Sequence, residues 1–140
     1  MLKTHETSIP QASIARSIPR IPGVPAFAAA GCGVEEVGRE PCGGARARAA
    51  HLVARRRSAG APRVLLIGHL DTVHPPGVGA TSLRRENDTL WGPGVGDIKG
   101  GVVAMLAALR MLAETGAASC ADVTVFLNSD EEVGSHCSRE

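Results

Sequence analysis

A short apolar run that ends in polar side chains stands near the middle of the chain: Val64-Leu65-Leu66-Ile67-Gly68-His69-Leu70-Asp71. Leucine and β-branched residues bounded by turn residues are typical of a central strand that is buried on both faces of a sheet. Residues i and i+2 of an extended chain face the same side, so His69 and Asp71 point together just past this strand. Open α/β sheets place their sites at this carboxyl end. The run therefore predicts a central strand with a candidate site directly after it.

Segments on either side of this run extend the pattern. Apolar or β-branched runs predict three further strands, at residues 33–40, 50–55 and 123–127. A hairpin is predicted at residues 82–91, and a glycine-rich loop at residues 92–96 leads into a helix predicted over residues 101–115. This helix is apolar almost all round, so we expect it to be well buried, with Gly116 as its C-terminal stop. The order of elements indicates an α/β fold in which helices pack against a sheet.

Composition excludes several classes of function. A chain of 140 residues can form one domain with a buried core, and its net charge is +1. This charge, with two Phe, one Trp and no Tyr, gives no support for binding to nucleic acid or to a membrane surface. No run approaches the roughly 18 apolar residues of a membrane-spanning helix. The string Ala29-Ala30-Gly31-Cys32 is weakly similar to a lipoprotein cleavage box but lacks a clean hydrophobic region, so a cytoplasmic location is expected.

The N-terminal part of the chain has a different character. Residues 1–31 show no period of 2 or 3.6 residues and contain four prolines. We therefore expect them to be disordered or to form an atypical N-terminal segment.

Two further segments place carboxylates in loop positions. Asp97 lies between the glycine-rich loop and the predicted helix, where the spacing fits neither a dinucleotide fingerprint nor a P-loop. Its carboxylate could cap the helix, or both of its oxygens could bind metal. Asp130, Glu131 and Glu132 follow the last predicted strand, and three successive acids repel one another unless cations or solvent neutralise them. Adjacent side chains diverge, so Glu131 and Glu132 can do different work.

Taken together, these side chains favour a metal site over ordinary polar loops. One imidazole and several carboxylates suit divalent metals, zinc above all. His69 is the candidate ligand, and Asp71 is the carboxylate that would orient its ring. Each segment alone also fits a polar strand end, a helix cap or an acidic turn, but all of them fall at loop ends of one predicted sheet. The remaining histidines lack this context and are expected to be ordinary surface or core residues: His5, His51, His74 and His136.

In residues 66–73, 91–101 and 130–135 the chain resembles the co-catalytic zinc peptidases, which include glutamate carboxypeptidase, acetylornithine deacetylase, succinyl-diaminopimelate desuccinylase and aminoacylase. The resemblance covers about residues 45–140. It implies part of a zinc-exopeptidase-like, three-layer α/β catalytic domain with a mixed central sheet, truncated in this chain. Residues 32–140 would be its N-terminal portion, without the lid or dimerisation domain and the C-terminal part.

The resemblance also implies a role for each site residue. His69 would bind one zinc ion, Asp97 would bridge two, and Glu132 would bind the second. Glu131 would be the general base, and Asp71 would support His69. A cis peptide bond is implied after Asp97. Zinc is the implied cofactor, two ions per complete site, with cobalt or manganese as alternatives.

The implied activity is zinc-dependent hydrolysis of an amide bond in a small peptide or N-acyl amino acid, of the carboxypeptidase or deacylase type. Full-length relatives can be homodimers. A further acidic ligand and a histidine of such proteins would fall beyond Glu140, so we expect the site of this chain to be incomplete. Two alternatives remain open. The chain is an inactive truncated fragment, or it is a non-catalytic α/β module that binds a cation or a protein partner.

Overall fold

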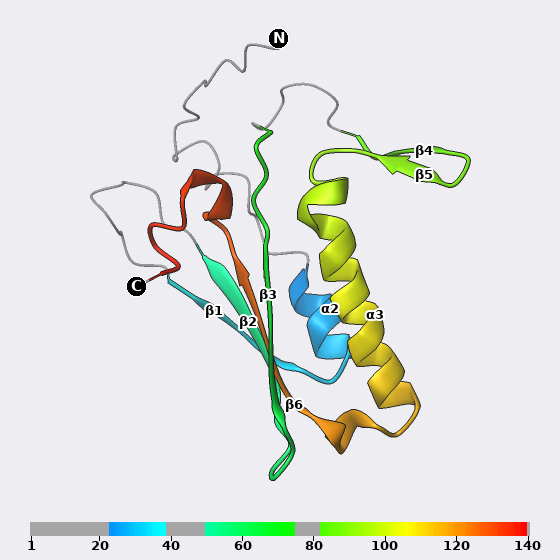
Figure 1. Cartoon of the computed structure of the whole chain (residues 1–140), viewed down its shortest axis with the longest axis vertical. Coiled ribbons are helices and arrows are strands. Elements are labelled where there is room, and N and C mark those ends of the chain that lie inside the picture. Colours follow the sequence, from blue (N-terminus) through cyan, green and yellow to red (C-terminus); the bar gives the residue numbers. More distant parts are fainter. Residues whose placement is uncertain (1–22, 39–49, 75–81, 140) are drawn as a thin grey trace.

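A computed structural model describes residues 23–38, 50–74 and 82–139, in which two helices pack on one face of a sheet (Figure 1). Among these residues the main sheet has the strand order β1-β2-β6-β3. Its strands are β1 (Gly33–Val37), β2 (His51–Arg56), β3 (Arg63–His69) and β6 (Asp122–Asn128). β1, β2 and β6 are antiparallel, whereas β3 runs parallel to β6. The predicted mixed α/β architecture is therefore confirmed, with the sheet and one helical layer formed by the described residues.

Of the remaining elements, one helix precedes β1, most of the others connect β3 to β6, and one short turn follows β6. The hairpin comprises β4 (Arg84–Glu86) and β5 (Thr89–Trp91), and the helices are α2 (Gly23–Ala29) and α3 (Gly100–Glu114). Three short helical turns are η1 (Val95–Lys99), η2 (Ala118–Cys120) and η3 (Glu131–Val133). The predicted hairpin, with its turn at Asn87, and the predicted α3 helix are confirmed to within a residue or two.

The hydrophobic core lies between the sheet and the two helices. Side chains alternate along a strand, so alternate residues of β2 and β6 face the helices. These side chains are almost fully buried together with Phe27 of α2 and Leu109 of α3; they are Leu52, Ala54, Val123, Val125 and Leu127. Burial of an aliphatic or aromatic side chain of this size contributes about 1.5–3 kcal/mol. The core therefore fixes β2 and β6 as the centre of the sheet.

β3 is an edge strand among the described residues, which corrects the expectation of a strand buried on both faces. It pairs with β6 alone, and the side chains of Leu65 and Ile67 are 59% and 60% exposed. Leu65 and Ile67 are exposed because their side chains point away from the helices, and no described element covers that face of the sheet. Leu66, on the opposite face, packs against the core.

α3 is less buried than its apolar composition predicts. Of its residues only Leu109 is buried, while Val103 and Met111 are each 63% exposed. One face of the helix contacts the sheet, and the opposite face is open (Figure 1). No helix of the described residues combines the length and apolarity needed to cross a membrane.

α2 occupies part of the N-terminal segment for which disorder was expected. Proline is tolerated in the first turn of a helix, where Pro25 lies, and Gly31 with φ of 79° ends the helix in the left-handed conformation. Phe27 is fully buried in the core. Disorder, one of the two alternatives expected for residues 1–31, is thus wrong for residues 23–31, and residues 1–22 lie outside the described residues.

We expect Phe27→Ala to lower the free energy of unfolding by about 3–5 kcal/mol, because it leaves a cavity between α2 and the sheet. Urea denaturation followed by far-UV circular dichroism measures this loss. Met111→Ala removes an exposed side chain of similar size and is expected to change stability by less than about 0.5 kcal/mol. Equal effects of the two substitutions would show that α2 is not part of the core.

Candidate metal centre

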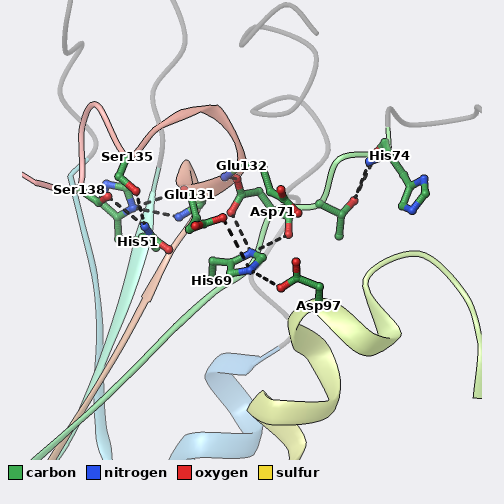
Figure 2. A network of polar contacts seen from close by, with 12 residues as sticks. His51, His69, Asp71, His74, Asp97, Glu131, Glu132, Ser135 and Ser138 are labelled. Carbon is green, nitrogen blue, oxygen red and sulfur yellow. Dashed lines mark hydrogen bonds and ion pairs between the residues drawn. The ribbon is translucent and has the colours of Figure 1, made fainter. Parts of the chain in front are cut away.

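His69 is the last residue of β3, and Asp71 contacts one side of its imidazole ring. The residue is 6% exposed, and Nδ1 lies 3.1 Å from the backbone carbonyl oxygen of Asp71 and 3.5 Å from its carboxylate Oδ1. With a carbonyl as its nearest partner, Nδ1 carries the proton and donates it. The Nε2 atom faces the acidic side chains on the other side of the ring, and it donates to Asp97 when the ring carries both protons (Figure 2).

Carboxylates from two other segments converge on this Nε2 atom. Asp97 Oδ1 lies 3.0 Å away and Glu131 Oε2 lies 3.9 Å away. One ligand atom each of His69, Glu131 and Glu132 fall within 4.8 Å of one another. The structure thus brings all five predicted site residues together, since Asp71 joins them by accepting the backbone N–H of Glu132 on Oδ2 at 2.9 Å.

Asp97 reaches the site from η1, directly before α3, where its backbone is extended (φ of −124°, ψ of 97°). The Asp97–Ile98 peptide bond is cis, as the resemblance implied. Gly94, which precedes the turn, has φ of 69°, and a Cβ atom there would lie 2.6 Å from Thr72 Cγ2. Glycine is therefore required at this close approach. The side chain of Asp97 is 79% exposed, so it can rearrange toward a ligand.

The site holds more negative charge than its own residues neutralise. Burial raises the pKa of Glu132, and the charges of Asp97, Asp71 and Glu131 raise it further against the lowering influence of His69. Burial alone would lower the pKa of His69. Its hydrogen bonds to Asp97 and to the Asp71 carbonyl, with the charges of Asp71 and Glu131, outweigh burial and raise it. Both shifts have the sign expected of a site that attracts cations.

Asp130 organises the loop that carries the two glutamates, a role the sequence did not reveal. It is 3% exposed, and its Oδ2 accepts the backbone N–H groups of Cys137 at 2.6 Å and Ser138 at 3.2 Å. Its carbonyl oxygen accepts the N–H of Ser135. Burial would raise the pKa of Asp130, but the hydrogen bonds from Ser138 and Cys137 lower it. Asp130 is thus a structural carboxylate beside Glu131, which is 52% exposed.

Two histidines for which the sequence predicted no role in the site also lie near it. His51, at the start of β2, is 2% exposed and accepts the backbone N–H of Ser129 on Nδ1 at 3.2 Å. His74 lines a cavity of about 250 Å³ that Asp97 and Glu132 also line. Ligand pockets usually measure about 300–1,000 Å³, so this cavity is slightly smaller than most of them. The His51 contact joins positions 78 residues apart, and no local pattern signals it.

Solved structures share this fold. Human carnosine dipeptidase 1 superposes with a TM-score of 0.66 over 89% of this chain and 31% of its own, at 20% identity. A tripeptidase from Staphylococcus aureus subsp. aureus Mu50 superposes with a TM-score of 0.63 over 83% of this chain and 31% of its own, at 24% identity. The described elements are therefore part of the fold that these two structures share.

Sequence comparison identifies the family. Residues 65–140 match the model of peptidase family M20/M25/M40, and the chain belongs to this family, as the resemblance implied. Carboxypeptidase G2 of Pseudomonas sp. (strain RS-16) is 38% identical over 91 residues, which are 64% of this chain and 22% of that protein. Succinyl-diaminopimelate desuccinylase of Gluconacetobacter diazotrophicus is 32% identical over 89% of this chain and 36% of its own. The chain thus spans about a fifth to a third of these relatives.

Asp130→Asn is expected to lower the free energy of unfolding by about 1.5–3 kcal/mol at pH 7, because the backbone N–H groups of Cys137 and Ser138 lose their charged acceptor. A carboxyl group whose pKa is lower in the folded state contributes stability above its unfolded pKa and loses it as the pH falls through its folded pKa. The difference from the wild type should therefore shrink below about pH 4.

Urea denaturation in EDTA, in steps from pH 7 to pH 3, measures this difference. Asp88→Asn is the matched control, because the Asp88 side chain is fully exposed in the β4–β5 turn. It should change stability little at any pH. A difference between wild type and Asp130→Asn that stays constant down to pH 3 would contradict the assigned role of the Asp130 charge.

Proposed function

We propose that this chain provides a zinc site and a general base for hydrolysis of an amide bond in a small peptide or N-acyl amino acid. The convergence of His69, Glu131 and Glu132 within 4.8 Å, with Asp97 in contact with His69, carries the proposal. Membership of peptidase family M20/M25/M40 supports it. So do the names of the relatives, which are a carboxypeptidase, a desuccinylase, a dipeptidase and a tripeptidase.

The donor set fits zinc. Zinc accepts imidazole nitrogen and carboxylate oxygen, and a metal-binding histidine usually donates its other N–H to a carbonyl or carboxylate. His69 has this arrangement, because Nδ1 faces the carbonyl of Asp71 and Nε2 faces the carboxylates. His69, Asp97 and Glu132 would hold the metal, whose charge would relieve the repulsion that raises the pKa of Glu132. Bound zinc supplies Lewis acidity, which lowers the pKa of water and polarises carbonyl groups.

Glu131 is the residue of this chain best placed to move a proton. Its carboxylate is about half exposed, Oε2 lies near His69 Nε2, and no backbone N–H of the described residues donates to it. A carboxylate so placed takes the proton of the attacking water on Oε2 and returns it to the leaving nitrogen. Asp71 orients His69 and holds the backbone of Glu132. The cavity beside Asp97 and Glu132 would receive the group next to the scissile amide.

Glu131→Ala is expected to reduce turnover by about 10²–10⁴-fold, because it removes the general base, and to leave the zinc content of the chain unchanged. His69→Ala, in contrast, should lose the zinc. Mass spectrometry gives the zinc content per chain after dialysis against trace zinc, and panels of N-acetyl amino acids and dipeptides give the hydrolysis rates.

Glu114→Ala, on the exposed surface of α3, is the matched control and should keep both zinc and turnover. Loss of zinc in Glu131→Ala would show that Glu131 is a ligand and that the roles of the two glutamates are exchanged. A wild-type chain that binds no zinc and hydrolyses no substrate of either panel would contradict the proposed function.

A further inference from the structure

His51 is a buried histidine that the proposed reaction does not use. It is the first residue of β2 and packs its ring against Phe126, with ring centroids 5.8 Å apart. The register of β2 and β6 pairs Leu52 with Leu127, so His51 lies level with the end of β6. The next residue of the chain there is Ser129, the first of the loop that leads to Glu131 and Glu132.

The imidazole of His51 is oriented by one hydrogen bond. The backbone N–H of Ser129 donates to Nδ1 at 3.2 Å, and the Ser129 hydroxyl lies 3.5 Å from the same atom. Because Nδ1 accepts, the proton of the neutral ring is on Nε2, which is buried and has no hydrogen-bond partner in the described part of the chain. Burial lowers the pKa of His51, whereas the charges of Asp130 and Asp71 raise it. The lowered pKa keeps the Nδ1 lone pair available as an acceptor.

The glutamate loop has three fixed points. Ser129 is held by His51 at its entry, Glu132 is held by the Asp71 carboxylate in its middle, and Asp130 binds the backbone of the exit. In Figure 2, His51 lies on one side of Glu131 and His69 lies on the other. Of the three, His51 alone ties the loop entry to β2, and Glu131 follows Ser129 by only two residues. A shift of Ser129 therefore moves the carboxylates that face His69.

We propose that His51 is a positioning residue for the metal centre, which acts by accepting the backbone N–H of Ser129 and so fixes the placement of Glu131 and Glu132. This inference rests on the proposed function for its metal, but the loop contact itself exists without metal. The acceptor atom at the Nδ1 position is the essential feature, and the aromatic ring is not.

Two substitutions separate the acceptor from the ring. His51→Asn places an amide oxygen at the position of Nδ1 and removes the ring, whereas His51→Phe keeps an aromatic ring beside Phe126 and removes the acceptor. His51→Leu is a second, smaller variant without an acceptor, in case the larger Phe ring prevents folding. Thermal unfolding of each metal-free variant shows that it is folded.

The first measurement is the affinity for Co²⁺, titrated by its visible absorption on the 140-residue chain. His51→Phe and His51→Leu should weaken binding by about 10–100-fold, and His51→Asn should stay within about threefold of the wild type. The second measurement is amide hydrogen exchange of residues 129–133 without metal. Exchange should be faster in the Phe and Leu variants and close to wild type in the Asn variant.

The outcomes are distinct. Wild-type affinity and exchange in His51→Phe, or equal loss in His51→Asn and His51→Phe, would overturn the proposal and leave His51 as a core residue. Absence of Co²⁺ binding by the wild type would count against the proposed function. The exchange comparison would then still decide whether His51 positions the loop.

Discussion

Parallel pairing of β3 with β6 is the constraint on which the site depends. The two strands are in register to their ends, with His69 opposite Asn128, and the N–H of Leu70 extends the ladder to the carbonyl of Asn128 at 2.7 Å. Both strands therefore end at the same end of the sheet, their carboxyl end. The crossover between them runs through α3, whose N-terminus returns to that end of the sheet and brings Asp97 with it (Figure 1). One hydrogen-bond register thus assembles residues from three loops.

The acids gathered at this end of the sheet are of two kinds. Asp71 and Asp130 are buried, and the Oδ2 atom of each accepts backbone N–H groups, so the fold itself helps to stabilise their charges. Asp97 and Glu131 are more exposed and have no such donors among the described residues, and burial with neighbouring charges raises the pKa of Glu132. The first kind holds loops in place, and the second kind remains available for a ligand.

The sequence correctly predicts the elements that have a clear local pattern of apolar residues. Apolar runs located β3 and β6, helical periodicity located α3, and the acids at the strand ends were placed correctly because the ends of neighbouring strands share an edge. The edge position of β3 could not be predicted from the sequence, because an apolar run does not reveal whether a strand pairs on one side or on both. α2 was missed because seven residues with a proline carry little periodicity. The hydrogen bond between His51 and Ser129 joins distant parts of the chain, so only the folded structure reveals it.

The position of β3 also has a consequence for how molecules of this chain meet in solution. Its outer edge has no partner strand among the described residues and lies beside Leu65 and Ile67, both well exposed, and edges of this kind are templates for strand addition by another molecule. A net charge of +1 gives two such molecules little mutual repulsion. Addition of a strand from a second molecule at this edge is therefore the contact that the described part of the sheet favours between two chains.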